Sequence, residues 1–445
     1  MENTDARPDA DSASEGTVLS RRSALKICAA AGGLYLATPM INCGRFQAFA
    51  QVGATYSARA IDLVEGSLVI DMLTALGGER WEKMWDNADA IGESDFQWLK
   101  SSGIGVFHVA GTTFGSRARE YAFKEFARLN SLILYKSAHV MRIDSAGDFE
   151  RVKREGKAGF LLGMQNSVHF DKVEDVDTFW LLGQRVSQLT HNDRDRIGSG
   201  GMAWFDGGLT EFGVAVVERM NKIGMTIDVA HCADRTTLEA IEASSKPVAV
   251  SHANCRALNP GYPRCKTDEA LRKMAAKGGV MGLTVLRAFV RGEEPTTIEH
   301  WLDHVDHVAK LVGVEHVGIG SDAGLATGSP KEDMEAMKWY EGLPSNIKKF
   351  YRFRIKFGID GLDHPKRVYD IAEGLIRRGY SDADVRGVLG LNFKRMLEET
   401  WSGRASRGNP PSAHVEPNAN PARSPSLYTA ADAGPSLGSF TRNEI

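Results

Sequence analysis

Short apolar runs alternate along this chain with longer segments in which apolar residues recur every three or four positions. Short, nearly continuous apolar runs are typical of strands buried on both faces, and the longer periodic segments are typical of helices that cover a sheet. The pattern predicts eight main strands, with an extra short one at 139–143. The eight are expected at 68–72, 105–110, 158–164, 185–190, 226–230, 248–251, 280–284 and 317–320.

Helical periodicity fills the segments between these strands. The clearest helices are expected at 117–135, 211–223, 234–243, 268–276 and 297–312. Eight strand–helix repeats within about 340 residues favour a (β/α)8 barrel with insertions, and a doubly wound open sheet is the alternative. No Gly-x-Gly-x-x-Gly sequence opens a helix after the first strand and no Walker A sequence is present, so nothing supports a nucleotide-binding fold.

Composition mainly excludes some classes of partner and motif. The chain is 42% hydrophobic and 25% charged, which is ordinary for a soluble globular protein. Its formal net charge is −3 and it has no long basic block, so nucleic acid is not an expected partner. The five cysteines form no Cys-x-x-Cys pair, which excludes a zinc knuckle and a thioredoxin-like motif.

The two ends of the chain differ from its middle. The segment 20–26 contains Arg21-Arg22 and resembles a twin-arginine export signal, followed by an apolar run and the small-x-small sequence Ala48-Phe49-Ala50. The apolar run is too short and too rich in glycine to cross a bilayer, so no transmembrane span is expected. We therefore predict an export signal over 1–50 and a periplasmic or secreted mature protein. A basic, poorly ordered tail is the alternative.

The last 43 positions are rich in Pro, Ser, Ala, Asn and Gly. Such a composition buries too little apolar surface to offset the entropy of ordering, so 403–445 is predicted to be a disordered tail. The barrel is thus assigned to 51–402. Three cysteines lie within it, and the sequence leaves a disulfide among them open (Cys232, Cys255 and Cys265).

Polar residues stand where several predicted strands end. One apolar run stops at His231, the next stops at His252, and the last predicted strand is followed by Asp322. Because the carboxyl ends of barrel strands meet at the active-site face, these three side chains are expected on the same rim. Two imidazole nitrogens and one carboxylate are a ligand set typical of zinc. The alternative is that each is a strand-end residue satisfied by hydrogen bonds.

Other strand ends supply weaker candidates. Gln165 follows the strand at 158–164, and His191 and Asn192 follow the strand at 185–190, where they would shape the pocket. Arg264 lies in a loop rich in proline and glycine. A guanidinium there can grip a carboxylate with two hydrogen bonds, although a loop arginine can also be a solvated charge.

Six segments, in order and at near-family spacing, resemble the membrane (renal-type) dipeptidase family. They are 227–234, 247–258, 263–271, 278–282, 318–322 and 390–393. The likeness is densest from about 185 to 400. Members of this family are zinc-dependent dipeptidases on an amidohydrolase-like barrel, so the resemblance implies a dipeptide or a small peptide-like molecule as the substrate. The family often forms dimers, and a homodimer is a further expectation.

The resemblance also assigns roles to individual residues. It implies that His231 and His252 are ligands of the family's second zinc. It implies that His191 contacts the substrate and the tetrahedral intermediate, and that Arg264 holds the substrate's terminal carboxylate. Asp322 resembles the aspartate at the catalytic centre, which accepts a proton or holds the substrate amine.

The first zinc site of the family is altered in this chain. Leu73 and Ala75 stand where the family has a His-x-Asp pair after the strand-one aspartate, Asp71, and Gln165 stands where it has a bridging glutamate. A neutral amide binds zinc far less well than a carboxylate does and cannot neutralise two adjacent dications. A dinuclear centre is therefore not expected, and a single zinc ion is, with Gln165 only a weak candidate ligand.

Three interpretations of function follow. The first is an exported, dipeptidase-like metallohydrolase. The second keeps the pocket but replaces hydrolysis by isomerisation or tautomerisation of a secreted peptide natural product, with His191 and Asp322 as acid and base. The third is a catalytically inactive protein that binds small peptides.

The remaining histidines carry less weight. Those spaced at i, i+4 and i+7 on the helix at 297–312 are expected on a solvated face rather than at a metal (His300, His304 and His307). Two others lie near predicted strand ends, where they could line the pocket (His108 and His169).

Overall fold

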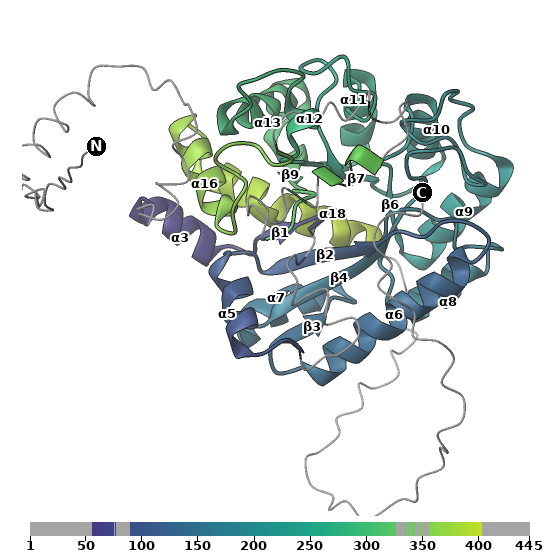
Figure 1. Cartoon of the computed structure of the whole chain (residues 1–445), viewed down its shortest axis with the longest axis horizontal. Helices are drawn as coiled ribbons and strands as arrows, with labels where there is room; N and C mark the ends of the chain where they lie inside the picture. The colour runs from purple at the N-terminus through teal and green to yellow at the C-terminus, as the bar shows by residue number, and fades with distance from the viewer. Residues whose placement is uncertain are drawn as a thin grey trace, which may run out of the picture. The chain divides into compact units, whose positions relative to one another are not determined.

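Eight parallel strands form a barrel in the computed structural model, which describes residues 56–74, 76, 90–325 and 356–402 and a few positions between 334 and 348. Helices surround the strands of this barrel (Figure 1). The barrel strands are β1 (Ile70–Asp71), β2 (Val106–Gly111), β4 (Ala158–Met164), β5 (Val186–Gln188), β6 (Thr226–Asp228), β7 (Ala249–Ala253), β8 (Val280–Leu283) and β9 (Val317–Ile319).

Pairing between the first and last strands closes the barrel. β1 pairs with β9 through Asp71 and Ile319, and β2 pairs with both β1 and β4. The short strand β3 (Val140–Arg142) pairs with β4 outside the ring, where the sequence predicts an extra strand. The (β/α)8 prediction is confirmed, and the open-sheet alternative is wrong because the two edges that it would leave free are hydrogen-bonded to each other.

The helices follow the strands as the periodicity predicts. They are α3 (Ala58–Gly66), α5 (Glu93–Ser101), α6 (Ala118–Tyr135), α7 (Ala146–Glu155), α8 (Asp175–Leu181), α9 (Glu211–Ile223), α10 (Asp234–Ala243), α11 (Asp268–Ala276), α12 (Arg287–Val290), α13 (Ile298–Val312), α16 (Arg367–Arg377), α17 (Asp382–Arg386) and α18 (Asn392–Trp401), with the single turns η2 (Val314–His316) and η3 (Gly387–Leu391). Their boundaries have local causes. For example, the Thr210 hydroxyl caps α9 by accepting from Gly213 N–H, and Gly224 ends that helix with φ of 82°.

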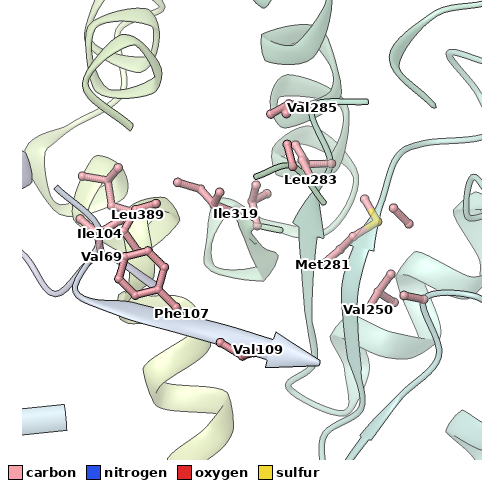
Figure 2. Close-up of a cluster of buried hydrophobic side chains, with 14 of the residues drawn as sticks. Val69, Ile104, Phe107, Val109, Val250, Met281, Leu283, Val285, Ile319 and Leu389 are labelled. Carbon is pink, nitrogen blue, oxygen red and sulfur yellow. The ribbon is translucent and has the colours of Figure 1, made fainter. Parts of the chain in front are cut away.

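Apolar side chains pack in two layers. The outer layer lies between the strands and the helices, and Figure 2 shows part of it, with Val250 on β7, Met281 and Leu283 on β8 and Ile319 on β9. A second cluster contains the alternate strand residues that face the interior, such as Val106, together with residues of α18. This alternation fixes which strand residues can reach a site inside the barrel.

Helix α18 packs under the barrel. A Cβ on Gly318 would lie 2.3 Å from the ring of Phe393, so the glycine leaves the space that this phenylalanine fills. Phe393 and Met396 belong to the interior cluster. The lower end of the barrel is therefore filled, and polar side chains are found at the carboxyl ends of the strands.

Within the part of the chain that the structure describes, no helix combines the length and the apolar character needed to cross a membrane. The predicted export signal at 1–50, the predicted tail at 403–445 and Ala75 lie outside the described residues.

Candidate functional site

Two histidines from neighbouring strands meet at the carboxyl end of the barrel. His231 follows β6 and His252 lies within β7, and their Nε2 atoms are 2.8 Å apart. β7 has an irregular register between Val250 and Ala253, the stretch that contains His252. A Cβ on Gly320, the residue after β9, would lie 1.8 Å from the carbonyl oxygen of Ser251 on β7, so glycine is required for these two segments to lie this close. The predicted histidine pair is thus present.

The outer nitrogens of both rings face oxygen acceptors. His231 Nδ1 lies 2.9 Å from Asn192 Oδ1, and His252 Nδ1 lies 2.8 Å from Ser251 Oγ. The Ser251 hydroxyl in turn donates to the buried carboxylate of Asp228, on β6. Since a carboxylate only accepts, the Ser251 proton points to Asp228, and the Ser251 oxygen accepts from His252 Nδ1–H. Asp228 and Ser251 therefore fix the tautomer of His252, a role that the sequence did not reveal.

The two inner nitrogens consequently face each other without a proton between them when both rings are neutral. Each imidazole carries one hydrogen, and here it lies on Nδ1 in both His231 and His252. Two lone pairs at 2.8 Å repel each other, so a cation between the rings, either a proton or a metal ion, would stabilise this arrangement.

His191 stacks on this pair. Its ring centroid lies 4.1 Å from that of His231, with an interplanar angle of 20°. On another side, Phe114 meets His191 edge to face at a centroid distance of 5.5 Å. His191 is half-buried, as is Asn192, and both follow β5 as predicted. The structure thus gathers His191, Asn192, His231 and His252 at one place.

Burial and positive charge keep these histidines neutral. Burial lowers the pKa of His191 to about 3, and the nearby Arg264 guanidinium contributes in the same direction. Burial and then Arg264 also lower the pKa of His231 and of His252 well below the usual value, with Lys266 adding to the effect. Neutral imidazoles are the form that binds a metal ion or donates a hydrogen bond to an anion.

Arg264 lies behind the histidines rather than in solvent. Its side chain has no exposed surface, its Nη1 donates to the carbonyl oxygen of Ala230, and its guanidinium carbon lies 5.1 Å from the centroid of the Phe289 ring. The solvated-charge alternative is wrong for this arginine. Its charge acts on the site through a poorly screened field, and a substrate carboxylate can touch it only after side chains at the mouth move.

Asp322 occupies a special backbone position beyond β9. Its φ is +55°, a left-handed conformation that non-glycine residues adopt sparingly and that is often found at functional sites. Asp322 N–H donates to the carbonyl oxygen of Leu73 at 2.8 Å. The buried carboxylate of Asp71 accepts from both Ser321 N–H and the Ser321 hydroxyl, at 2.8 and 2.6 Å. Asp71 therefore supports the strand end that presents Asp322.

Among the residues that the structure describes, no carboxylate stands in place of the altered ligands of the family's first metal site. Leu73 is buried and apolar, and the half-buried Gln165 donates its amide to the carbonyl oxygen of Ala110 at 3.3 Å. Among the described residues, no three or more His, Cys, Asp or Glu side chains are arranged to hold a metal ion. Asp322 thus does not complete a three-ligand set with His231 and His252. His231 and His252 are therefore the two candidate metal ligands that the described part of the chain brings together.

A further histidine lies inside the barrel below this site. His108 is buried, its Nδ1–H donates to the carbonyl oxygen of Met72, and its Nε2 has no hydrogen-bond partner among the described residues. A Cβ on Gly163 would lie 2.2 Å from this Nε2, so the glycine on β4 makes room for the ring. His108 is therefore an interior residue and not a residue of the open mouth.

Other candidate histidines belong to the protein core. His169 is buried, bonds Gln184 Oε1 at 3.0 Å and packs on Phe170 and Phe179, so it does not line the pocket. His304 is also fully buried: its Nδ1 accepts from Cys255 N–H and its Nε2–H donates to the carbonyl oxygen of Val290. The prediction of a solvated face is wrong for His304, because α12 and the segment after β7 cover it.

The neighbours of His304 on α13 have separate partners. His300 bonds Thr297 and Arg291, and His307 bonds Asp268 Oδ1 at 2.8 Å, so the three helix histidines form no metal site.

The cysteines of the barrel form no disulfide with one another. They are three buried free thiols (Cys232, Cys255 and Cys265).

The geometry of the site can now be compared with known proteins. A family model described as membrane dipeptidase (peptidase family M19) matches residues 57–349, well over half of the chain. The chain belongs to the membrane dipeptidase family. Members of this family are zinc-dependent metallopeptidases, so the family relationship and the histidine pair point to the same kind of site.

Sequence relatives of this dipeptidase-family chain include annotated dipeptidases. It is 30% identical over 252 residues to dipeptidase verJ of Clonostachys rogersoniana, a match that covers 56% of each chain. It is 28% identical over 211 residues to a Klebsiella pneumoniae protein described as uncharacterized and encoded in the pqqA 5′ region, with 45% of this chain and 78% of the relative covered. The chain spans less than two thirds of the length of the fungal dipeptidases that it matches.

Solved structures share the barrel. An amidohydrolase from Pseudomonas aeruginosa superposes with a TM-score of 0.65 at 28% identity, over 77% of this chain and 99% of that one. A metallopeptidase from Rhodobacter sphaeroides, liganded with a phosphinate mimic of L-Ala-D-Ala, superposes with a TM-score of 0.59 over 75% of this chain and all of that one. The second similarity, at 17% identity, shows the shared fold only.

Proposed function

We propose that this member of the membrane dipeptidase family hydrolyses the amide bond of a dipeptide or small peptide-like molecule with one metal ion at the barrel mouth. The observation that carries the proposal is the contact between His231 and His252. Their Nδ1 atoms are hydrogen-bonded to Asn192 and Ser251, and their Nε2 atoms face each other where a single cation could bind. Hydrogen bonds from the outer nitrogens of metal-binding histidines are the usual way in which proteins orient such ligands.

The proposed ion is zinc, held by His231 and His252. When bound, it would polarise the scissile carbonyl and lower the pKa of a coordinated water towards about 7. Gln165 stays a weak candidate for a further ligand, because its side chain is an uncharged amide. Leu73 offers no ligand atom, which supports a count of one ion rather than two.

The protein groups would act on the substrate around that ion. We assign to Asp322 the role of accepting a proton or holding the substrate amine, since it follows β9 at the carboxyl end of the barrel and its backbone has a left-handed conformation. Neutral His191 would donate a hydrogen bond to the oxyanion of the tetrahedral intermediate, with Asn192 beside it. The field of Arg264 would attract the terminal carboxylate of the substrate.

Export is part of the proposal. The Arg21-Arg22 pair, the apolar run and the Ala48-Phe49-Ala50 sequence support removal of 1–50 and action of the barrel in the periplasm or outside the cell. Replacing both arginines by lysine should leave the protein in the cytoplasm, which cell fractionation measures. Equal amounts of exported protein from both sequences would contradict this part.

The experiment that tests the proposed activity is metal analysis combined with dipeptide cleavage. The expected content is about one zinc per chain in the wild type and in the control His307→Ala, and close to none in the double variant His231→Ala/His252→Ala. Cleavage of dipeptides should be lost with the metal. Two ions per chain would contradict the single-metal site, and a metal-free wild type that cleaves no dipeptide would contradict the proposal as a whole.

One observation favours a second candidate function. The facing nitrogens of His231 and His252 can share a proton instead of a metal ion, and no described carboxylate joins them. An acid–base enzyme, such as an isomerase or tautomerase of a peptide natural product, would use this pair together with His191 and Asp322. Substrate conversion that persists after complete metal removal would favour this function.

A further inference from the structure

Three large aromatic side chains stand exposed around the candidate site. Phe114, in the loop after β2, is 43% exposed, Phe205 is 57% exposed, and Trp204 is fully exposed. Single exposed apolar residues are common on protein surfaces, but exposed aromatic residues on loops that adjoin a candidate site can mark a binding surface. We call Phe114, Trp204 and Phe205 the aromatic rim.

Phe114 lies directly beside the candidate catalytic residues. Its ring meets the His191 ring at 5.5 Å between centroids, and His191 stacks on His231 at 4.1 Å. A substrate that contacts His191 therefore lies within reach of the exposed face of Phe114. This contact connects Phe114 to the site.

Trp204 and Phe205 stand at the tip of a loop whose first half is tied to the same site. Gly201 N–H donates to the carbonyl oxygen of His231, and Met202 N–H donates to that of Asn192 at 2.9 Å. These bonds join the loop to two of the residues that surround the histidine pair.

The second half of the loop is held just as firmly. Gly207 N–H donates to Ser199 Oγ at 2.9 Å, and the Asp206 carboxylate accepts from Arg235 N–H at 2.6 Å. The loop is therefore fixed on both sides of its two aromatic residues. A loop held on both sides presents its exposed tryptophan at little further entropic cost, and binding of an apolar group would remove that apolar surface from water.

We propose that the aromatic rim is a specificity element, which selects peptide-like substrates with a bulky apolar side chain over those with small side chains. The inference rests on the proposed function for the location of the substrate, but it needs binding only and not turnover. The occupant is a substrate side chain, because Phe114 contacts His191 and because the loop of Trp204 is bonded to His231 and Asn192.

The test compares three dipeptides, Ala-Ala, Phe-Ala and Ala-Phe, on the metal-loaded protein. Dissociation constants come from calorimetry, and kcat/KM replaces them for any dipeptide that is cleaved. The variants are Phe114→Ala and Trp204→Ala. Leu134→Ala is the matched control, because Leu134 is an apolar residue that is 77% exposed, and it lies at the end of α6 rather than on either loop of the aromatic rim. Thermal unfolding verifies that each variant is folded.

The wild type should prefer at least one of the phenylalanine dipeptides over Ala-Ala by about tenfold, the range expected for burial of an aromatic side chain against another. Phe114→Ala and Trp204→Ala should reduce the ratio of phenylalanine-dipeptide to Ala-Ala binding at least about threefold, while Leu134→Ala keeps that ratio. A wild type without preference, or variants that keep it, would overturn the inference.

The two proposals fail in different ways. Cleavage of all three dipeptides at similar rates would overturn the specificity element and support the hydrolase. Preferential binding without cleavage would support the aromatic rim and contradict the hydrolase. Absence of binding by all three dipeptides would overturn both.

Discussion

Replacing Asp228 by asparagine should weaken binding of the proposed metal ion, although Asp228 reaches the ligand His252 only through Ser251. In the wild type, Asp228 Oδ1 accepts from Ala230 N–H and Ser251 N–H, both at 2.9 Å, and its other oxygen accepts from the Ser251 hydroxyl. An asparagine keeps its carbonyl oxygen on the two backbone groups and turns its NH2 towards Ser251. The hydroxyl must then donate to His252 Nδ1, so the proton of His252 moves to Nε2, where a metal ion would bind.

The magnitude follows from the chemistry of such supporting groups. Loss of a hydrogen-bonding partner behind a ligand usually reduces metal affinity about 10- to 100-fold, which corresponds to about 1.4–2.7 kcal/mol. Competition with a chromophoric zinc chelator measures this affinity directly. Ser251→Ala, which removes the hydroxyl but introduces no new donor, should fall between the wild type and Asp228→Asn.

Asp382→Asn is the matched control, since Asp382 is an exposed carboxylate that pairs with Arg59 on the surface. It should bind zinc as the wild type does. If Asp228→Asn remains folded and its zinc affinity stays within about twofold of that control, the assignment of the His252 tautomer is wrong. If Asp228→Asn fails to fold, wild-type affinity in Ser251→Ala refutes the reasoning instead.

Three further predictions concern stability, measured by urea denaturation. Burial lowers the pKa of His169 and of His304 to about 4 from the ordinary 6.5. Between about pH 6.5 and 4, the unfolded chain therefore binds protons at these histidines that the native protein does not bind. The free energy of unfolding should fall by about 1.4 kcal/mol per histidine for each unit by which the pH is lowered through this range. His169→Phe should reduce that slope by one histidine's share, and an unchanged slope would contradict the assignment. Gly163→Ala should lower the free energy of unfolding by about 1–3 kcal/mol, because the added Cβ meets the ring of His108. Adding His108→Ala should restore part of that stability. If the two changes are simply additive, the clash does not occur. Asp71→Ala should cost about 2–4 kcal/mol, because two buried donors at the end of β9 lose their acceptor, and a loss below about 0.5 kcal/mol would show that water replaces it.

The strands of the barrel could be predicted because each is buried on both faces. The run at 317–320, for example, contains β9 (Val317–Ile319), and the extra strand at 139–143 contains β3 (Val140–Arg142). Closure of the barrel could be inferred only from the number of repeats, since no local pattern encodes the pairing of Asp71 with Ile319. Long-range pairing depends on the packing of the whole chain and not on any one segment.

The site was predictable where it consists of strand ends. His231 and His252 follow apolar runs directly, and barrel geometry alone places two such residues side by side. Asp228 gave a weaker signal, a single charge within an apolar run, and its bond to Ser251 depends on the register of two strands. The solvated face expected for His304 was wrong because helical periodicity shows which residues share a face but not which segment covers that face.

Packing of α18 beneath the barrel, together with closure between β1 and β9, also constrains when the protein can fold during its synthesis. Asp71 bonds Ser321 across 250 positions of sequence, and the interior cluster needs Phe393. A nascent chain that has not yet reached β9 cannot close the barrel, and one that has not yet reached α18 leaves the lower end of the barrel unfilled. The barrel can therefore assemble only after α18 has been synthesised, and until then chaperones that cover its apolar strands would protect the chain from aggregation.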